Sequence, residues 1–297
     1  MPGEFDLIDW IKSQHPPTDF VPVPQGDDLA VLRWNAADLL LVGVDQVLDG
    51  IHFDSAIHSP RLIGRKAMNR NLSDCAAMAC LPAAAVVSVA LPNGAGIDYA
   101  KELYLGLREA ADPFDCKLVG GDTGSWPGKL AVTVTLLGKS AGIQPITRSG
   151  AKPGDGIYVT GPLGGSILGR HMNFTSRIVI ARELAATGSV TAMLDISDGL
   201  SRDLRQICNQ SHVGAVIDAA AVPIHDDAIE LSRRDRRSSL EHALHDGEDH
   251  ELLFTAAHTP DVKGIVRVGT ILPEVGTWLQ QGDHRIELAP RGWQHSL

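Results

Sequence analysis

Basic residues, cysteines and long apolar runs are scarce in this chain of 297 residues. It carries 36 acidic against 26 basic side chains, a formal net charge of −10. This balance argues against general nucleic-acid binding, which needs a basic face. No uncharged apolar run approaches the length of a membrane span, so no membrane association is expected. The first residues resemble no signal peptide, because a basic segment and an apolar core are both missing.

The cysteine content is low and its spacing is uninformative for metal binding. Cys75, Cys80, Cys116 and Cys208 form no Cys-x-x-Cys pair, and the first two lie in an apolar, alanine-rich stretch. We therefore expect reduced core residues, not zinc ligands or disulfides, and a cytoplasmic protein.

The common nucleotide-binding motifs are absent as well. Residues 161–165 form a glycine-rich turn after a predicted strand, but the Gly-Lys-Ser/Thr ending of a P-loop and the spacing of a dinucleotide fingerprint are missing. The protein-kinase motif set and a Ser-His-Asp ordering are also missing. A nucleotide, if bound, would be held by metal ions and backbone groups instead of a lysine cradle.

What the chain has instead is aspartate at the ends of predicted elements. In residues 193–200 an apolar run ends at Asp195, a polar turn with Asp198 and Gly199 follows, and helical spacing begins at Leu200. This order predicts strand, loop and helix, with both aspartates where a buried strand meets solvent. Helix capping by Ser197 or Asp198 explains this segment, taken alone, equally well.

The same association of aspartate with glycine or serine recurs along the chain. Hard cations such as Mg²⁺ prefer carboxylate oxygens and often bridge to phosphates. Turns alone also collect aspartate and glycine, so each position by itself indicates little, whereas the whole set favours metal binding. The positions are Asp28, Asp45, Asp74, Asp122, Asp195, Asp198 and the segment Asp246-Gly247-Glu248-Asp249.

Helix and strand patterns predict two α/β halves, each with helices layered on a sheet. The best boundary is the Gly-, Ser- and Pro-containing segment 147–155, which divides the chain into domains 1–146 and 147–297. Expected helices cover residues 4–13, 60–79, 97–111, 178–186 and 200–209. Expected strands cover residues 29–34, 39–44, 83–91, 117–119, 130–137, 156–160, 215–218, 252–254 and 265–271. A further strand is expected to end at Asp195, and a further extended piece is expected at residues 47–53. A loop is expected at residues 120–124.

Several single residues allow two interpretations. Asn69, Asn71 and Ser73 form either a surface stripe on their helix or a set of buried groups that serve phosphate, backbone or the metal at Asp74. His52 and Arg148, taken alone, are most simply packed or solvated side chains. Tyr104 would be a core residue, and Trp293 a packing anchor.

Taken together, the motifs resemble those of thiamine-monophosphate kinases. The resemblance spans nearly the whole chain, and the set of motifs is specific although no single one is. In order, they are Gly3-Glu4-Phe5, Gly26-Asp27-Asp28, Asp45 with His52-Phe53, Asn71-Leu72-Ser73-Asp74, Gly120-Gly121-Asp122-Thr123, the segment 147–155, Asp195-Ile196-Ser197-Asp198-Gly199-Leu200 and Gly247-Glu248-Asp249.

The resemblance implies a fold, an activity and an assembly. The fold is the two-domain α/β (α+β) fold of aminoimidazole-ribonucleotide synthetase, in which the N-terminal sheets of two chains pair into a barrel-like homodimer. The implied reaction is direct, Mg²⁺-assisted transfer of a phosphoryl group from ATP to thiamine monophosphate. By resemblance, the metal ligands and catalytic residues are Asp28, Asp45, Asp74, Asp122, Asp195 and Asp198. The implied ATP contacts are Tyr104, Gly121, Asp122, Arg148 and Ser197, and the implied substrate contacts are His52, Glu248 and Trp293.

The chain also departs from the family pattern. Relatives carry hydroxyl residues just before the aspartate that matches Asp45, whereas this chain has Gly43 and Val44, so one or two metal contacts are lost or made by backbone carbonyls. The acidic loop has Asp246 and His250 where a glycine and a tyrosine are usual, and a His-x-x-Pro-x-x-Arg segment survives only as residues 171–177.

Two rivals remain at this stage. One is a sister enzyme of the same fold with another acceptor, although selenophosphate synthetase is disfavoured because no cysteine precedes Cys75. The other is a non-catalytic nucleotide-binding paralogue, which the change at Gly43 and Val44 allows.

Overall fold

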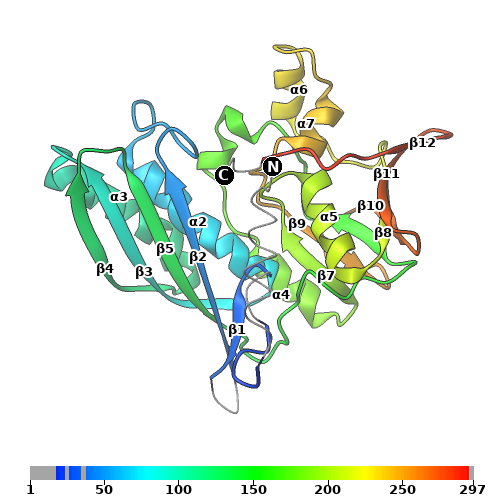
Figure 1. The fold of residues 1–297 in the computed structure, drawn as a ribbon, viewed down its shortest axis with the longest axis horizontal. Helices are drawn as coiled ribbons and strands as arrows, with labels where there is room; N and C mark the ends of the chain where they lie inside the picture. Colours follow the sequence, from blue (N-terminus) through cyan, green and yellow to red (C-terminus); the bar gives the residue numbers. More distant parts are fainter. Residues whose placement is uncertain (1–17, 24–26, 35–37, 294–297) are drawn as a thin grey trace.

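The chain folds around two β-sheets that lie side by side, as the ribbon in Figure 1 shows. The computed structural model describes residues 18–23, 27–34 and 38–293. The expected helix at residues 4–13 and the motif Gly3-Glu4-Phe5 lie outside this part. No helix within it is both long enough and apolar enough to span a membrane.

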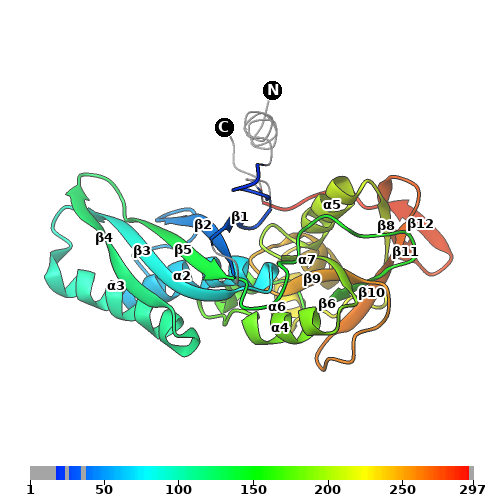
Figure 2. The same ribbon diagram turned by 90° about the horizontal axis from the view of Figure 1, so that it is seen from below.

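The first sheet has the strand order β1-β2-β5-β3-β4. Its β5 strand alternates between buried and half-buried residues, as expected when a sheet is covered on one face only. Figure 2 shows α3 along that covered face. The elements are β1 (Ala30–Arg33), β2 (Leu39–Leu48), α2 (Pro60–Ala77), β3 (Leu81–Pro92), α3 (Gly96–Ala111), a 3₁₀ turn (Asp112–Phe114), β4 (Lys117–Trp126) and β5 (Ala131–Lys139).

The expected loop at residues 120–124 is wrong, because this segment continues β4. Its residues pair in parallel with β3, for instance Val87 with Gly121. A Cβ atom at Gly121 would lie 1.9 Å from the Val87 carbonyl oxygen, so only glycine allows this close approach. The glycines favoured a loop in the sequence-based prediction. In the structure they allow β4 to pair closely with β3.

Helix α2 is the element that connects the two sheets. Its N-cap Ser59 accepts a hydrogen bond from the Leu62 N–H, and Pro60 opens the first turn. The surface-stripe interpretation of its polar residues is wrong: Asn69 and Ser73 are buried. Asn69 Nδ2 donates to the Phe174 carbonyl at 2.8 Å, and Ser73 Oγ donates to Asp195 at 2.5 Å.

The second sheet has the strand order β12-β11-β8-β10-β6-β9-β7 and is mixed, because β8 and β11 pair in parallel while its other pairs are antiparallel. Helices cover both faces, α2 and α4 on one and α5 on the other. The elements are β6 (Gly156–Val159), 3₁₀ turns (Ser166–Leu168 and Arg170–Met172), α4 (Ile178–Ala186), β7 (Val190–Asp195), α5 (Leu200–Ser211), β8 (Gly214–Asp218), α6 (Asp226–Ser232), α7 (Ser239–His245), β9 (Leu252–Ala256), β10 (Val266–Leu272), β11 (Gly276–Gln281) and β12 (His284–Glu287).

The expected α/β architecture is confirmed, and so is the expectation that all four cysteines are free and buried. The hydrophobic core is continuous across the two halves, because Met193 and Phe254 of the second sheet belong to the same cluster as Leu72 of α2. The last strand of the first sheet ends at Lys139 and the next strand begins at Gly156. The domain boundary between residues 146 and 147 stays a prediction.

Candidate functional site

The predicted strand, loop and helix at residues 193–200 are present. Strand β7 ends at the buried Asp195, and Gly199 leads into α5 with a φ of 111°, a conformation that glycine tolerates. The capping interpretation of Ser197 and Asp198 is wrong, because Gly199 is the N-cap residue. Instead, the Asp203 carboxylate accepts the N–H groups of Asp198 and Gly199, both at 3.0 Å, and so fixes the loop.

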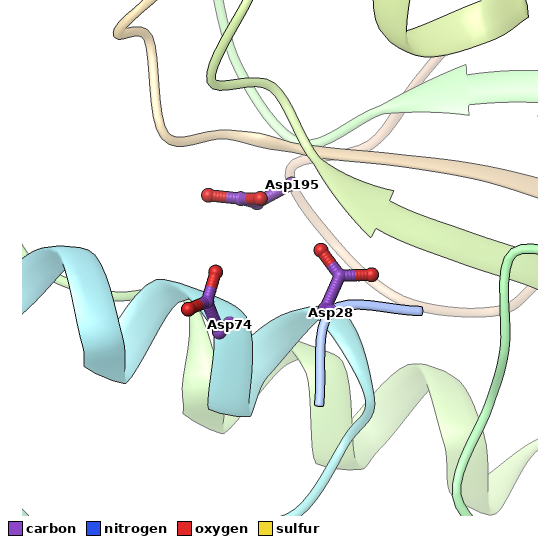
Figure 3. A group of neighbouring side chains, drawn as sticks. All are labelled: Asp28, Asp74 and Asp195. Carbon is purple, nitrogen blue, oxygen red and sulfur yellow. The ribbon is translucent and has the colours of Figure 1, made fainter. Parts of the chain in front are cut away.

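Three predicted metal ligands converge at one point between the sheets (Figure 3). One carboxylate oxygen from each of Asp28, Asp74 and Asp195 lies within 4.8 Å of the others. They come from the segment before β1, from α2 and from the end of β7. Arg148 holds Asp28 through two hydrogen bonds of 3.0 Å. We call these three residues the carboxylate trio.

The electrostatics of the carboxylate trio favour a bound cation. Burial, followed by the like charges of the neighbouring carboxylates, raises the pKa of Asp74 well above its ordinary value. Burial also raises the pKa of Asp28, against the effect of the Arg148 guanidinium. The pKa of Asp195 is lowered, because hydrogen bonds from His250 and Ser73 outweigh its burial. Crowded carboxylates of this kind fit Mg²⁺, a hard cation that takes oxygen ligands.

Asp45 lies outside the carboxylate trio, in a network of four charged side chains. Arg70 Nε donates to Asp45 Oδ2 at 2.5 Å, and Arg70 Nη1 donates to Glu248 Oε1 at 3.2 Å. Lys66, whose side chain is fully buried, lies 2.8 Å from the same Glu248 oxygen and donates to the His52 carbonyl at 2.6 Å. The network therefore connects α2, β2 and the loop that carries Glu248.

A cavity of about 550 Å³ opens beside this network and brings several predicted residues together. His52, Glu248 and Trp293, the three predicted substrate contacts, line it together with Ser197 and Asp198. Glu248 has a φ of 51°, a strained value for a residue with a side chain. Its N–H donates to the Ser197 carbonyl at 2.8 Å, which holds this conformation in place.

His52 is half-buried, as expected for a packed histidine, whereas Trp293 is not the packing anchor that it resembles when taken alone. Burial, and then the positive charge of Arg70, lowers the pKa of His52 to about 4. The imidazole is therefore neutral near pH 7. Trp293 is 47% exposed and lines the cavity, so it is no buried packing anchor.

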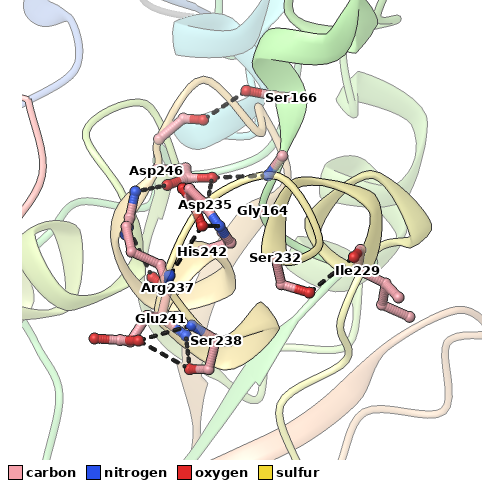
Figure 4. A network of polar contacts seen from close by, with 12 residues as sticks. Gly164, Ser166, Ile229, Ser232, Asp235, Arg237, Ser238, Glu241, His242 and Asp246 are labelled. Carbon is pink, nitrogen blue, oxygen red and sulfur yellow. Dashed lines mark hydrogen bonds and ion pairs between the residues drawn. The ribbon is translucent and has the colours of Figure 1, made fainter.

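A hydrogen-bonded unit of α6, α7 and the segment between them forms one wall of this cavity (Figure 4). His242 lies between two carboxylates, 2.8 Å from Asp246 and 3.3 Å from Asp235. Asp246 also accepts the Gly165 N–H at 3.1 Å. The glycine-rich turn therefore directs an N–H group at a carboxylate, which agrees with the missing P-loop signature.

Tyr104, Gly121 and Asp122 lie elsewhere, around a second cavity of about 450 Å³ between α3 and β4. Tyr104 is 49% exposed, so the expectation of a core residue is wrong. Strand pairing runs from Asp45 to Val134, then to Val87 and Gly121. Three strand spacings separate the ends of this row by roughly 14 Å, and Asp122, as the next residue, points to the opposite face from Gly121. One chain therefore keeps Asp122 away from Asp45.

Comparison with known proteins identifies the family. Residues 26–140 match the family AIR synthase related protein, N-terminal domain, and residues 152–258 match its C-terminal domain. Over 293 residues, the chain is 38% identical to the thiamine-monophosphate kinase of Rhodopirellula baltica, with 93% of this chain and 92% of that protein covered. The chain belongs to the thiamine-monophosphate kinase family.

Further relatives of this family agree. The thiamine-monophosphate kinase of Bacillus subtilis is 34% identical, with 86% of this chain and 84% of that protein covered. A solved structure described as AaThiL complexed with AMPPCP and TMP superposes with a TM-score of 0.85 at 28% identity, covering 99% of this chain and 97% of that chain. The thiamine-monophosphate kinase structure from Aquifex aeolicus gives 0.79 at 26% identity, with 92% and 96% covered.

Three residues that shape the site in this member of the thiamine-monophosphate kinase family were not predicted from the sequence. They are Lys66, Arg70 and Asp203. The first two had a signal: Lys66, Arg70 and Asp74 follow one another at intervals of four, so they lie on one face of a helix. Asp203 had none, because a carboxylate in the first turn of a helix is common for purely local reasons.

Proposed function

We propose that this protein transfers the γ-phosphoryl group of ATP to the phosphate of thiamine monophosphate. The bond between the γ-phosphorus and the bridging oxygen of ADP breaks as an acceptor phosphate oxygen bonds to the γ-phosphorus. The products are thiamine diphosphate and ADP. The observation that carries this proposal is the carboxylate trio beside the cavity lined by His52, Glu248 and Trp293. Family membership supports it, since a relative is described in complex with AMPPCP and TMP.

Mg²⁺ is the metal that we assign to the carboxylate trio, because its donor atoms are all carboxylate oxygens. When bound, Mg²⁺ would neutralise phosphate charge and so lower the repulsion between donor and acceptor. Asp198 lines the neighbouring cavity and extends the proposed ligand set. Asp45 would join it only if its ion pair with Arg70 opened.

The acceptor chemistry needs no general base. An alcohol must lose a proton to attack, whereas a phosphate oxygen is already anionic at neutral pH. His52, with a pKa of about 4, is neutral there and serves in our proposal to orient the acceptor. Glu248 and Trp293 would contact the thiamine portion. Transfer is direct, because no step requires a phosphorylated side chain.

A homodimer completes the proposed site. The open face of the first sheet presents Val44, 63% exposed, and Val86, 38% exposed, in one row across the strands. We propose that the same face of a second copy covers this row and delivers Asp122, with Gly121 and Tyr104 contacting ATP. Arg148 and Ser197 would contact ATP from the first copy. The separation of Asp122 from Asp45 within one chain supports this arrangement.

A product assay tests the assignment. The protein is incubated with Mg·ATP and either thiamine monophosphate or thiamine, and the products are separated by chromatography. We expect thiamine diphosphate from the monophosphate and no phosphorylation of thiamine. Phosphorylation of thiamine, or no product from the monophosphate, would contradict the proposal. Labelled phosphate retained on the protein without acceptor would overturn direct transfer only.

The same proposal places the enzyme in the cytoplasm and gives it no nucleic-acid partner.

A further inference from the structure

Arg70 occupies both oxygens of Asp45, and this contact has no place in the function described so far. The Nε–H group donates to Asp45 Oδ2 at 2.5 Å, and Nη2 donates to Oδ1 at 3.5 Å. Asp45 Oδ1 also accepts the Gln46 N–H at 2.8 Å. The Arg70 side chain is only 16% exposed. A charge-assisted contact at two points, in a half-buried place, is among the stronger polar contacts in proteins.

The two residues before Asp45 offer a metal ion no side-chain oxygen. Gly43 has no side chain, so it can offer a metal ion only its backbone carbonyl oxygen. Val44 follows with an apolar side chain that is 63% exposed. Mg²⁺ demands a near-octahedral set of oxygen atoms, and these two residues supply no side-chain oxygen.

The charge around Asp45 is already balanced. Asp45 and Glu248 are paired with Arg70 and Lys66, which makes two negative and two positive side chains in contact. The carboxylate trio differs, because it contains three carboxylates. Arg148 pairs with one of them, Asp28. Asp28 is held by an arginine too, but it lies among two further carboxylates, and Asp45 does not belong to that group.

We propose that the Arg70 guanidinium takes the place of a divalent cation at Asp45. This inference rests on the proposed function and adds a positioning residue to it. Arg70 holds Asp45 and Glu248 at the cavity and supplies there a positive charge that is part of the chain. The metal ions then belong to the carboxylate trio and its extensions. The charge at Asp45 does not depend on the Mg²⁺ concentration, because a guanidinium stays protonated.

Counting bound Mn²⁺ tests this inference without any turnover. Electron paramagnetic resonance gives the number of Mn²⁺ ions per chain for the full-length protein with AMPPCP. We expect Arg70→Met to bind one more Mn²⁺ than the wild type, because Asp45 is released. Arg70→Lys, which keeps a positive charge, should not gain it. Adding Asp45→Asn to Arg70→Met should remove the extra ion.

The matched control is Arg61→Met, which removes an arginine of the same helix that pairs with Glu102 and Glu109 at the surface. Its Mn²⁺ count should equal that of the wild type. In turnover, Arg70→Met should raise the half-saturating Mg²⁺ concentration about tenfold and recover rate at high Mg²⁺, since one charge-assisted contact is lost. A purely structural role would give no such recovery.

Two results would overturn the proposal. One is a folded Arg70→Met protein whose Mn²⁺ count does not rise. The other is a loss of one Mn²⁺ on Asp45→Asn in the otherwise wild-type chain, which would make Asp45 a ligand as the family resemblance implies. This second variant decides the matter even if Arg70→Met does not fold. A wild type that fails to make thiamine diphosphate would refute the proposed function and leave the Mn²⁺ counts interpretable.

Discussion

At the scale of single residues, the six predicted aspartates are in different environments. Asp74 is half-buried among other carboxylates, Asp122 is exposed on β4, and Asp45 is paired with an arginine. An ionised carboxylate destabilises the folded protein when it is removed from water and lies close to other negative charges. The same substitution therefore has different consequences for stability at Asp74 and at Asp122, even where the consequences for catalysis agree.

Asp74→Asn and Asp122→Asn should both abolish turnover and leave the fold intact. Without metal, Asp74→Asn should raise the free energy of unfolding by about 1 kcal/mol, because it removes one of several crowded charges. Asp122→Asn should leave it unchanged. Thermal unfolding in EDTA and the thiamine diphosphate assay check both statements. Wild-type activity in either variant would refute its assignment, and equal stability changes would refute the crowding argument.

The low pKa of His52 predicts a pH dependence of stability. Folding lowers its pKa from 6.5 to about 4. The unfolded chain therefore binds the proton more readily, and stability is lost as the pH falls through this interval. Denaturant unfolding at several pH values should show a smaller loss for His52→Gln than for the wild type. His258→Gln, at an exposed histidine, is the matched control and should behave like the wild type. Identical pH profiles for all three proteins would contradict the prediction.

At the scale of elements, sequence patterns found the strands and helices that bury an apolar side. Helix α4 matches its expected range, and β7, the loop and α5 follow the expected order. The hairpin of β11 and β12 was not predicted. All four residues of β12 are exposed, so this strand has no alternation of apolar and polar residues. The pairing of β4 with β3 was not predicted either, since it depends on a neighbour from another part of the chain.

The family resemblance named residues that the structure brings together, and their roles in the site stay predictions. The resemblance implied the carboxylate trio as metal ligands and His52, Glu248 and Trp293 as substrate contacts, and each set lies together in the structure. The ion pair between Arg70 and Asp45 could not be predicted, because charge pairing depends on which helix face meets which strand. The separation of Asp122 from Asp45 likewise follows from strand order, which composition does not reveal.

The crossing of α2 and α3 yields a prediction at this scale. A Cβ atom at Gly106 would lie 1.8 Å from the Arg61 carbonyl oxygen, and one at Gly64 would lie 2.1 Å from that of Leu103. Gly106→Ala should therefore lower the free energy of unfolding by about 2 kcal/mol or more, because the helices must separate. Helix propensity alone would make the alanine variant more stable by about 1 kcal/mol. The sign of the change in the free energy of unfolding therefore shows whether the close contact or the propensity dominates. Urea unfolding measures it, and a stabilised variant would contradict the close contact.

At the scale of the whole molecule, the two cavities belong to different regions of one chain. The first lies between the sheets, and the second lies between α3 and β4. If ATP spans both regions, each working site uses two chains related by a two-fold axis. Dimerisation is then a condition for catalysis and not only for stability.

Mixing inactive variants tests this arrangement. An Asp74→Asn chain and an Asp122→Asn chain, combined by unfolding and refolding together, form mixed dimers in which one of the two sites is intact. We expect roughly a quarter of the wild-type rate from a random mixture, because half of the dimers are mixed and each has one site. Light scattering should show dimers at micromolar concentration. A mixture as inactive as its components, or a monomer in solution, would refute the shared site.

The contacts that build the site join distant parts of the chain. Ser73 and Asp195 are 122 residues apart, Arg148 and Asp28 are 120 apart, and Arg70 and Glu248 are 178 apart. Contacts of such long range form late in folding, after the loops that separate them have closed. During synthesis, the first sheet leaves the ribosome long before Glu248 is made. Nucleotide and metal therefore cannot stabilise the growing chain, which depends on its apolar core alone until nearly the whole sequence has been translated.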